Sequence, residues 1–338
     1  MTLTYLCTLD LPDAWFDELG ARVPGVRIIR AGQSTPTGEV LADVDFLHTS
    51  DWFPEASTVP SLKCVQLDTS GVDHVRQTSL WHTTVPIATL GGIAPVPMAE
   101  YALMAILELS HRMPRIQQLR DARAWPSNAD RLAHLTPRRL EGATVGVVGY
   151  GRIGREISRL AAPFGMTVLG VKRSVGDAAS LAGAGGKFDT GRRGADADPT
   201  EVFPMDRLDE VLRRSSILVV VVPLTELTRG MIGAAQLDLL PAGALVVNIA
   251  RGGIVDEEAL RERLRDGRIG GVALDVFDDE PLPPDSPWWS EPGALVTPHV
   301  AGLAPQYHAQ TLDLVVENLI RLADGRPVLN EVDRVSGY

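Results

Sequence analysis

Three side chains that could take part in chemistry lie at or shortly after the ends of apolar stretches of the chain. Arg251 follows "ALVVNIA", Glu280 ends "VALDVFDDE" and His299 follows "ALVTP". The nearly continuous Val, Ile and Leu residues of these stretches predict strands buried on both faces of a parallel sheet. Ligands bind at the carboxyl ends of such strands. We therefore expect the three side chains at one sheet edge, although each alone is more often structural.

The residue types indicate a ligand that carries a carboxylate next to a carbonyl. A planar guanidinium such as that of Arg251 can hold both groups in fork geometry. The imidazole of His299 can donate a proton near neutral pH. Asp278 and Asp279, which precede Glu280, are interpreted as a solvated acidic turn.

The stretch "GVVGYGRIGREI" carries a G-x-G-x-x-G pattern at Gly149, Gly151 and Gly154. A predicted strand precedes the pattern and a predicted helix follows it. These glycines allow a tight turn, close approach of the backbone to a diphosphate, and close packing of helix on strand. In this context the pattern predicts a dinucleotide site, and a purely structural glycine turn is the alternative.

A basic triplet, Lys172, Arg173 and Ser174, follows the next predicted strand. An Asp or Glu at this place would bind the ribose 2′-hydroxyl of NAD and repel a 2′-phosphate. A guanidinium, an ammonium and a hydroxyl suit a phosphate instead. The triplet therefore predicts NADP(H) as the preferred cofactor and NAD(H) as a second one, with a solvated basic turn as the alternative.

Short apolar runs alternate with helical patterns, which is typical of parallel α/β architecture. One series of predicted strands lies before residue 91, and a second, more apolar series lies between residues 144 and 298. We expect a Rossmann-type cofactor domain (100–299) inserted in a discontinuous, flavodoxin-like substrate domain (1–99 and 300–338). Residues 175–204 are small, Gly-rich and charged, which predicts a surface loop.

The composition is that of an ordinary globular protein, with 338 residues, 45% hydrophobic and 22% charged. The net charge of −11 argues against a nucleic-acid partner, because phosphate contacts need a basic face. No stretch predicts a signal peptide or a membrane span. Cys7 and Cys64 lie in apolar runs, which suits reduced thiols in the cytoplasm. The histidines show no metal-ligand spacing, so no metal is expected.

Several motifs, in the same order, resemble those of the D-isomer-specific 2-hydroxyacid dehydrogenases. Besides the glycine pattern they are "TSGVDHV" (69–75), "MAEYALMAIL" (98–107), "VVPLTELTRGMIG" (221–233), "NIARGGIVDEEAL" (248–260), "LDVFDDEPL" (274–282) and "TPHVAG" (297–302). The resemblance covers nearly the whole chain. It implies an oxidoreductase that interconverts small 2-keto acids, such as glyoxylate or hydroxypyruvate, and D-2-hydroxy acids by hydride transfer.

By this resemblance the catalytic residues are Arg251, Glu280 and His299. Arg251 would hold the carboxylate and the carbonyl of the keto acid. His299 would donate a proton to the carbonyl oxygen as hydride arrives from the nicotinamide, and Glu280 would hydrogen-bond that imidazole and favour its protonated form. Backbone N–H groups at Ser70 and Gly71 would bind the substrate together with Arg251 and His299.

The resemblance also implies a cofactor site and a homodimer built on the cofactor domain. The expected cofactor residues are Gly149, Tyr150, Gly151, Arg152, Ile153, Gly154, Lys172, Arg173, Ser174, Val222, Pro223, Thr228, Ile249, Ala250, Arg251 and Asp275. Asp275 resembles the acid that contacts the nicotinamide carboxamide, whereas Asp68 and Asp73 are interpreted as turn residues. The helix from Met98 to Met113 and the arm around Trp125 would lie at or near the dimer contact, and simple core burial of that helix is the alternative.

Two alternative functions share this fold. An NAD-linked phosphoglycerate-type dehydrogenase is disfavoured, because the chain ends soon after its last predicted helix and leaves no room for a regulatory domain. A dinucleotide-sensing corepressor uses the fold as a binding module, but the intact set of Arg251, Glu280 and His299 favours an enzyme. The expected partner is a small 2-keto or 2-hydroxy acid, with no nucleic acid and no membrane.

Overall fold

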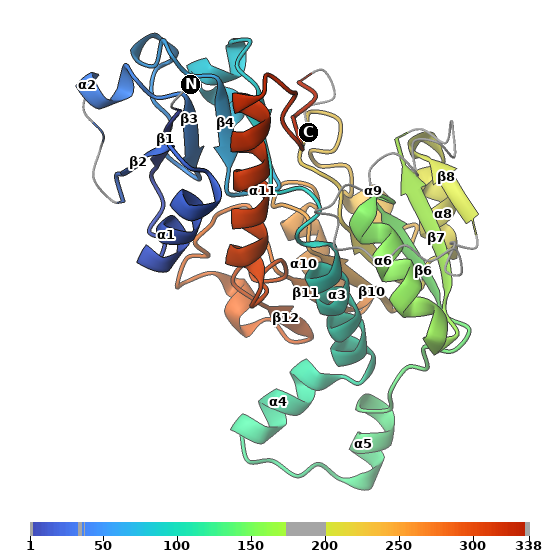
Figure 1. Ribbon diagram of the computed structural model, residues 1–338. Helices are drawn as coiled ribbons and strands as arrows, with labels where there is room; N and C mark the ends of the chain where they lie inside the picture. The colour runs from blue at the N-terminus through green and yellow to red at the C-terminus, as the bar shows by residue number, and fades with distance from the viewer. Residues whose placement is uncertain (1–2, 33–35, 37, 174–200, 335–338) are drawn as a thin grey trace. The chain divides into compact units, whose positions relative to one another are not determined.

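The computed structural model describes residues 3–32, 36, 38–173 and 201–334, which form two compact units (Figure 1). Unit 1 contains the described residues of Met1–Ile93 and Ala304–Tyr338, and unit 2 contains those of Ala94–Gly185 and Thr190–Leu303. The chain therefore passes from unit 1 into unit 2 and returns. No helix in the described ranges has both the length and the apolar character that a membrane crossing needs.

Unit 1 is built around a five-stranded parallel sheet in the order β2-β1-β3-β4-β5. This is the strand order of flavodoxin-like folds, as predicted. Its apolar strands are short, and β1, β3 and β4 are buried along their whole length. The strands are β1 (Thr4–Cys7), β2 (Arg27–Arg30), β3 (Phe46–Thr49), β4 (Cys64–Leu67) and β5 (Ile87–Ala88).

The last helix of the chain packs on this first sheet. Together with α1 (Asp13–Arg22) and α2 (Gly38–Leu41), α11 (Tyr307–Ala323) forms the helical part of unit 1, and Figure 1 shows α11 beside the strands. Apolar side chains of α1, α11 and β1 share one core cluster. The buried Asn318 of α11 donates to Gln66 Oε1 of β4 at 2.9 Å. The segment at the end of the chain therefore completes the domain that the first segment begins.

Unit 2 is built around a seven-stranded parallel sheet in the order β12-β11-β10-β9-β6-β7-β8. Counted from β6, this is the 3-2-1-4-5-6 order of dinucleotide-binding domains with one strand added at the edge. The strands are β6 (Thr144–Val148), β7 (Thr167–Lys172), β8 (Glu201–Pro204), β9 (Ile217–Val220), β10 (Ala244–Asn248), β11 (Ile269–Leu274) and β12 (Ala294–Val296).

Helices cover both faces of this second sheet. One core cluster joins the strands to α3 and α6, and a second joins them to α8, α9 and α10. Because the inner strands β6, β7, β9, β10 and β11 are buried on both faces, they need the continuous apolar sequence that is observed. The helices are α3 (Pro95–Ser110), α6 (Arg152–Ala161), α8 (Leu208–Arg214), α9 (Ala234–Leu237) and α10 (Glu257–Arg265).

Two short helices form an arm that extends from the body of unit 2 (Figure 1). They are α4 (Met113–Asp121) and α5 (Asn128–His134), and neither contains a buried residue. The sequence predicts one helix from Met98 to Met113, and that prediction is wrong at its end. Arg112 has a left-handed backbone (φ 57°), which breaks the helix and turns the chain into the arm.

A strand that the sequence did not reveal lies at the sheet edge. β8 pairs in parallel with β7, and its Phe203 is 2% exposed. The predicted surface loop over 175–204 is therefore wrong for its last four residues, Glu201–Pro204. Phe203 and Val202 of this short edge strand pack against the two core clusters of the sheet. The rest of that segment lies outside the described residues.

Candidate active site

Arg251 lies in the turn that follows β10. The strand ends at Asn248, whose side chain is buried and holds the turn. Its Oδ1 accepts from the Ala250 N–H at 3.1 Å, and its Nδ2 donates to the Arg251 carbonyl at 3.3 Å. The Arg251 guanidinium donates to the Ala250 carbonyl at 2.7 Å. The turn is therefore well defined and places a cation at the carboxyl edge of the sheet.

Glu280 and His299 form a hydrogen-bonded pair at the same edge. Glu280 follows β11, His299 follows β12, and His299 Nδ1 lies 2.7 Å from Glu280 Oε2. The other carboxylate oxygen of Glu280 accepts from the Phe277 N–H at 2.9 Å, which orients the carboxylate. The histidine and glutamate side chains remain 47% and 35% exposed. Because Nδ1 is engaged, Nε2 is the ring nitrogen that can exchange a proton with a ligand.

Asp275 holds the segment that carries His299. Its carboxylate is 1% exposed and accepts from Thr297 Oγ1 (2.6 Å), the Val300 N–H (2.8 Å) and the Ala301 N–H (2.9 Å). His299 itself has φ 53°, a left-handed conformation that is unfavourable for a residue with a side chain. The bonds from Asp275 on both sides of His299 stabilise that conformation. The carboxylate expected at the nicotinamide thus serves the 297–301 segment in this structure.

Tyr101 extends this network and was not expected from the sequence. Its Oη lies 2.5 Å from Thr297 Oγ1, and Thr297 in turn donates to Asp275. Burial raises the pKa of Tyr101 to about 12, so the phenol remains protonated at neutral pH. Tyr101 belongs to α3, far from Thr297 in the sequence. The only available signal was that both residues fall in motifs of the resemblance.

Each of the three glycines of the motif is a glycine for a different structural reason. Gly149 has φ 111°, and a Cβ there would lie 2.7 Å from the Val221 carbonyl carbon. A Cβ at Gly154 would lie 2.6 Å from the Gly149 carbonyl oxygen. A Cβ at Gly151 would meet nothing within 4 Å, and α6 begins at the next residue. The first and third glycines permit packing, and the second leaves open space at a helix N-terminus.

The remaining residues of the glycine pattern are Tyr150, which is buried, and Arg152 and Ile153, which begin α6. The Tyr150 side chain is 3% exposed, and a Cβ at Gly170 would lie 2.4 Å from its Cδ2 atom. Tyr150 is therefore a core residue, and its N–H donates to the Val171 carbonyl at 2.8 Å. Arg152 and Ile153 are the first two residues after Gly151 and begin α6, where the N–H groups lack intrahelical partners.

Lys172 and Arg173 of the basic triplet directly follow Val171, whose carbonyl binds the glycine turn. The Gly149 and Tyr150 N–H groups both donate to the Val171 carbonyl, at 2.9 and 2.8 Å. β7 then ends at Lys172, and the exposed Arg173 follows. Ser174, the third residue of the triplet, lies outside the described residues.

The remaining expected cofactor residues lie after β9 and β10, which flank each other beside β6. In the loop after β9, Thr228 Oγ1 donates to the Pro223 carbonyl at 2.6 Å and accepts from the Thr225 N–H at 2.8 Å. These bonds shape the loop, so the Thr228 hydroxyl serves the fold in this structure. Val222, Ile249 and Ala250 are buried at this edge, where the Ile249 N–H donates to the Val220 carbonyl and the Ala250 N–H to Asn248 Oδ1.

The expected substrate turn of unit 1 follows β4. Thr69 Oγ1 donates to the Gly71 carbonyl at 2.8 Å, and the Leu90 N–H donates to the Thr69 carbonyl at 2.9 Å. Ser70 is exposed at the tip. The backbone of this turn is therefore fixed at the carboxyl edge of the first sheet.

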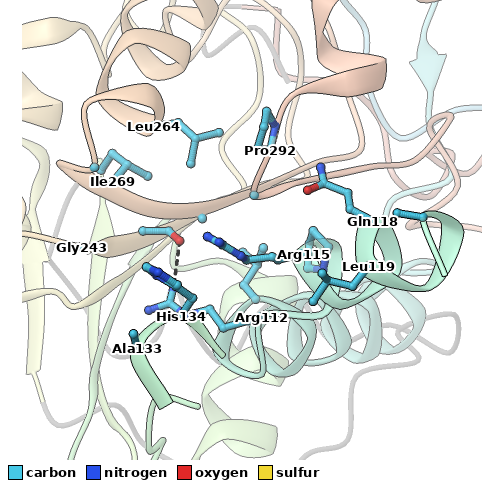
Figure 2. A pocket seen from close by; sticks show the side chains of 17 residues that line it. Arg112, Arg115, Gln118, Leu119, Ala133, His134, Gly243, Leu264, Ile269 and Pro292 are labelled. Atoms are coloured by element: carbon cyan, nitrogen blue, oxygen red, sulfur yellow. Dashed lines mark hydrogen bonds between the residues drawn. The ribbon is translucent and has the colours of Figure 1, made fainter. Parts of the chain in front are cut away.

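A cavity of about 790 Å³ in unit 2 lies at the opposite edge of the second sheet (Figure 2). Gly243 and Ile269, at the amino ends of β10 and β11, line it together with Arg112, Arg115 and His134. Because the expected catalytic residues follow the carboxyl ends of strands, this cavity is separate from them. Across the described ranges, no group of three or more His, Cys, Asp or Glu side chains could hold a metal ion.

Comparison with known proteins decides the family. The model for the NAD binding domain of the D-isomer specific 2-hydroxyacid dehydrogenases matches residues 103–301. The chain belongs to this family. Among dehydrogenases of curated function, glyoxylate/hydroxypyruvate reductase A from Klebsiella pneumoniae (strain 342) is 30% identical, over 99% of this chain and 98% of that protein.

Solved structures of 2-hydroxyacid dehydrogenases have the same fold. One from Xanthobacter autotrophicus Py2, in complex with NADPH and MES, is 30% identical with a TM-score of 0.79 over 100% of both chains. The NADPH-dependent glyoxylate/hydroxypyruvate reductase from Sinorhizobium meliloti, in complex with NADP and sulfate, is 27% identical with a TM-score of 0.80 over 100% of both chains. The predicted family and the predicted α/β fold class are thereby confirmed.

Proposed function

We propose that this dehydrogenase reduces small 2-keto acids, such as glyoxylate or hydroxypyruvate, to D-2-hydroxy acids with NADPH. The hydrogen bond between Glu280 and His299 carries the proposal. It orients a histidine at the sheet edge that also holds the glycine turn and Arg251. The glyoxylate/hydroxypyruvate reductases among the relatives support the same substrate class.

The proposed mechanism is general acid catalysis on a keto acid held by its charge. Arg251 binds the carboxylate and the carbonyl oxygen as a fork. His299 donates its Nε2 proton to that oxygen, which becomes the product hydroxyl, and takes the proton back in the reverse direction. Glu280 accepts from Nδ1 and stabilises the imidazolium by its charge. A bound reduced nicotinamide supplies the hydride.

The described residues fit a dinucleotide with a 2′-phosphate. The open space at Gly151, at the N-terminus of α6, suits a diphosphate. Lys172 and Arg173 follow the Val171 carbonyl that binds the glycine turn, which is where the adenosine ribose is expected. NADP(H) is therefore the preferred cofactor of the proposal, with NAD(H) used less well. The NADPH and NADP complexes of relatives support this preference.

The two units have separate proposed roles. Unit 2 is the cofactor domain and supplies Arg251, Glu280 and His299. Unit 1 is the substrate domain, whose Ser70 and Gly71 N–H groups bind a carboxylate. The sequence places the domain limits at 99/100 and 299/300, and the units divide at Ile93/Ala94 and Leu303/Ala304. The Cys7 and Cys64 thiols are free and buried, which supports a reducing, cytoplasmic location.

A panel of 2-keto acids, assayed with NADPH and with NADH, tests the proposed function. Glyoxylate and hydroxypyruvate should oxidise NADPH, and the same compounds should work less efficiently with NADH. Phosphorylated and longer 2-keto acids provide the comparison for substrate size. A protein that binds NADPH but oxidises it with no 2-keto acid would contradict the proposal and favour a binding module.

Replacing Glu280 with Gln should lower kcat for keto acid reduction by about 10–10²-fold, because the amide carries no charge to stabilise the imidazolium of His299. The KM for NADPH should stay the same. Steady-state kinetics at one pH measure both values. Asp279→Asn, at the exposed neighbouring carboxylate, is the matched control and should leave kcat near the wild-type value. Full kcat in Glu280→Gln would remove Glu280 from the mechanism.

We also propose a homodimer in which a second copy covers the arm. α4 and α5 bury none of their residues, and isolated helices of this length are marginal in water. The arm also exposes Trp125 (87%) and Leu132 (67%). The arm borders the cavity of Figure 2, so a second copy would cover the exposed side chains of the arm and the cavity together. Twofold dimers are the commonest closed assemblies.

Light scattering should give twice the chain mass of 36.4 kDa at micromolar concentration. Replacing both Trp125 and Leu132 with Glu should shift the protein toward the monomer, because two charges would then be buried without partners. Leu227→Glu, at an exposed leucine outside the arm, is the control and should remain dimeric. A wild-type monomer, or a dimer that survives the double replacement, would contradict this assembly.

A further inference from the structure

A buried histidine in unit 1 takes no part in the mechanism above. His48 of β3 is 0% exposed. Its Nδ1 lies 2.7 Å from Tyr5 Oη of β1, and its Nε2 lies 3.3 Å from Asp68 Oδ1, just after β4. The Trp15 ring of α1 covers the imidazole, with ring centroids 5.8 Å apart. Both ring nitrogens therefore have polar partners within the core of unit 1.

The surroundings favour the charged form of His48. Burial alone would lower the pKa of the imidazole, but hydrogen bonds to Asp68 and Cys7, and the negative charge of Asp68, raise the pKa to about 9. Within the described part of unit 1, the titratable groups that face the ring are Tyr5 and Cys7 of β1 and Asp68. Burial raises the pKa of Tyr5 well above its usual value, so its phenol stays neutral. At neutral pH the pair is an imidazolium and a carboxylate.

Asp68 is the residue that enters the expected substrate turn, Thr69 to Gly71. Its N–H donates to the Thr49 carbonyl at 2.9 Å, and its carbonyl accepts from Tyr307 Oη at 2.9 Å. Its side chain is 18% exposed and lies toward His48. A negative charge is therefore fixed two residues before Ser70, on the chain that must receive a substrate carboxylate. Without a cation beside it, this charge would repel an anionic ligand.

We propose that His48 is a positioning residue for the substrate: its buried cation neutralises and holds Asp68, so that the Ser70–Gly71 turn can bind a carboxylate. This inference rests on the proposed function of that turn. His48 touches neither substrate nor cofactor and acts through Asp68. A buried histidine that served only the fold would change stability, with no selective effect on the affinity for the keto acid.

Replacing His48 with Gln keeps a polar side chain but removes the cation. We expect the KM for glyoxylate to rise about fivefold or more, because Asp68 is then an unpaired anion near the bound carboxylate. The KM for NADPH should not change. Adding Asp68→Asn to His48→Gln removes the anion as well, so the double variant should recover most of the lost affinity. This recovery separates a charge effect from a loss of structure.

The matched control is Lys63→Gln. Lys63 Nζ lies 2.8 Å from Asp45 Oδ1, at the amino ends of β3 and β4 in the same sheet. Its removal also leaves a partly buried aspartate without its cation, but at the edge away from the turn. It should lower the melting temperature without raising the KM for glyoxylate. An equal rise of KM in Lys63→Gln would show that general destabilisation explains the effect.

The pH dependence of the wild-type protein tests the same inference without a substitution. His48 is protonated below its pKa of about 9 and loses its proton as the pH rises through that value. The cation beside Asp68 is then lost, so the KM for glyoxylate should rise above about pH 9. The wild-type protein and His48→Gln both contain His299, so a pH effect at the active site is the same in the two proteins. The KM of His48→Gln should therefore be high at neutral pH already and lack this additional rise.

The outcomes of this experiment separate the two proposals. If the wild-type protein reduces no 2-keto acid with NADPH, the proposed function fails. If the wild-type protein is active and His48→Gln has an unchanged KM for glyoxylate, the inference about His48 is overturned. It is also overturned if KM rises in His48→Gln and does not fall again in the double variant. Circular dichroism and melting curves of each variant confirm that folded proteins are compared.

Discussion

Replacing His299 with Ala should lower the turnover number for glyoxylate or hydroxypyruvate reduction by roughly 10²–10⁴-fold, which is the usual contribution of a general acid. The methyl group of alanine cannot donate a proton to the carbonyl oxygen. Arg251→Ala should also lose most of the activity, and in addition its KM for the keto acid should rise, because the carboxylate loses its guanidinium partner. Steady-state kinetics with saturating NADPH measure both parameters.

The control for this experiment is His82→Ala, at an exposed histidine of unit 1 outside the proposed site. It should keep the wild-type kcat and KM. Binding of NADPH to His299→Ala, followed by fluorescence, should also be retained, because the glycine turn is unchanged. Near-full turnover in His299→Ala would show that another group supplies the proton.

Replacing Arg173 with Ala should raise the KM for NADPH about tenfold more than the KM for NADH. The reason is the loss of charge-assisted hydrogen bonds to the 2′-phosphate, which are worth roughly 1.5–3 kcal/mol each. Lys172→Asp should go further and favour NADH, because a carboxylate there binds a ribose 2′-hydroxyl and repels a phosphate. The ratio kcat/KM with each cofactor, at a fixed glyoxylate concentration, measures the preference.

Arg213→Ala is the matched control, since it removes an exposed arginine of α8 from the same unit. It should leave the cofactor preference unchanged. Equal efficiency of the unmodified protein with NADPH and NADH would mean that Lys172 and Arg173 form only a solvated turn.

The strands and the residues after them could be predicted because buried parallel strands require continuous apolar sequence. Arg251, Glu280 and His299 each follow such a run, so strand ends and motif order located them before their geometry was known. The structure adds the 2.7 Å hydrogen bond between Glu280 and His299. It also adds the reason that Gly149 and Gly154 must be glycine, which is the close approach of neighbouring backbone.

The parts that sequence could not predict depend on contacts between distant segments. β8 pairs with β7 but has only two apolar residues, Val202 and Phe203, between a glutamate and a proline, so it lacks the apolar run that marks the other strands. His48 and Asp68 are 20 positions apart and meet only because β3 and β4 are neighbours. The family resemblance implies that Asp275 contacts the nicotinamide, yet its carboxylate accepts hydrogen bonds from the 297–301 segment. Such roles follow from tertiary structure and leave no local pattern.

The stereochemistry of the product tests whether the protein is a D-specific 2-keto acid reductase. Hydroxypyruvate should be incubated with NADPH and the purified protein, and the glycerate formed should be resolved by chiral chromatography. D-glycerate should form in equal amount to the NADPH oxidised, and none should form with His299→Ala on the same timescale. Formation of L-glycerate, or no oxidation of NADPH by any 2-keto acid, would contradict the proposed function.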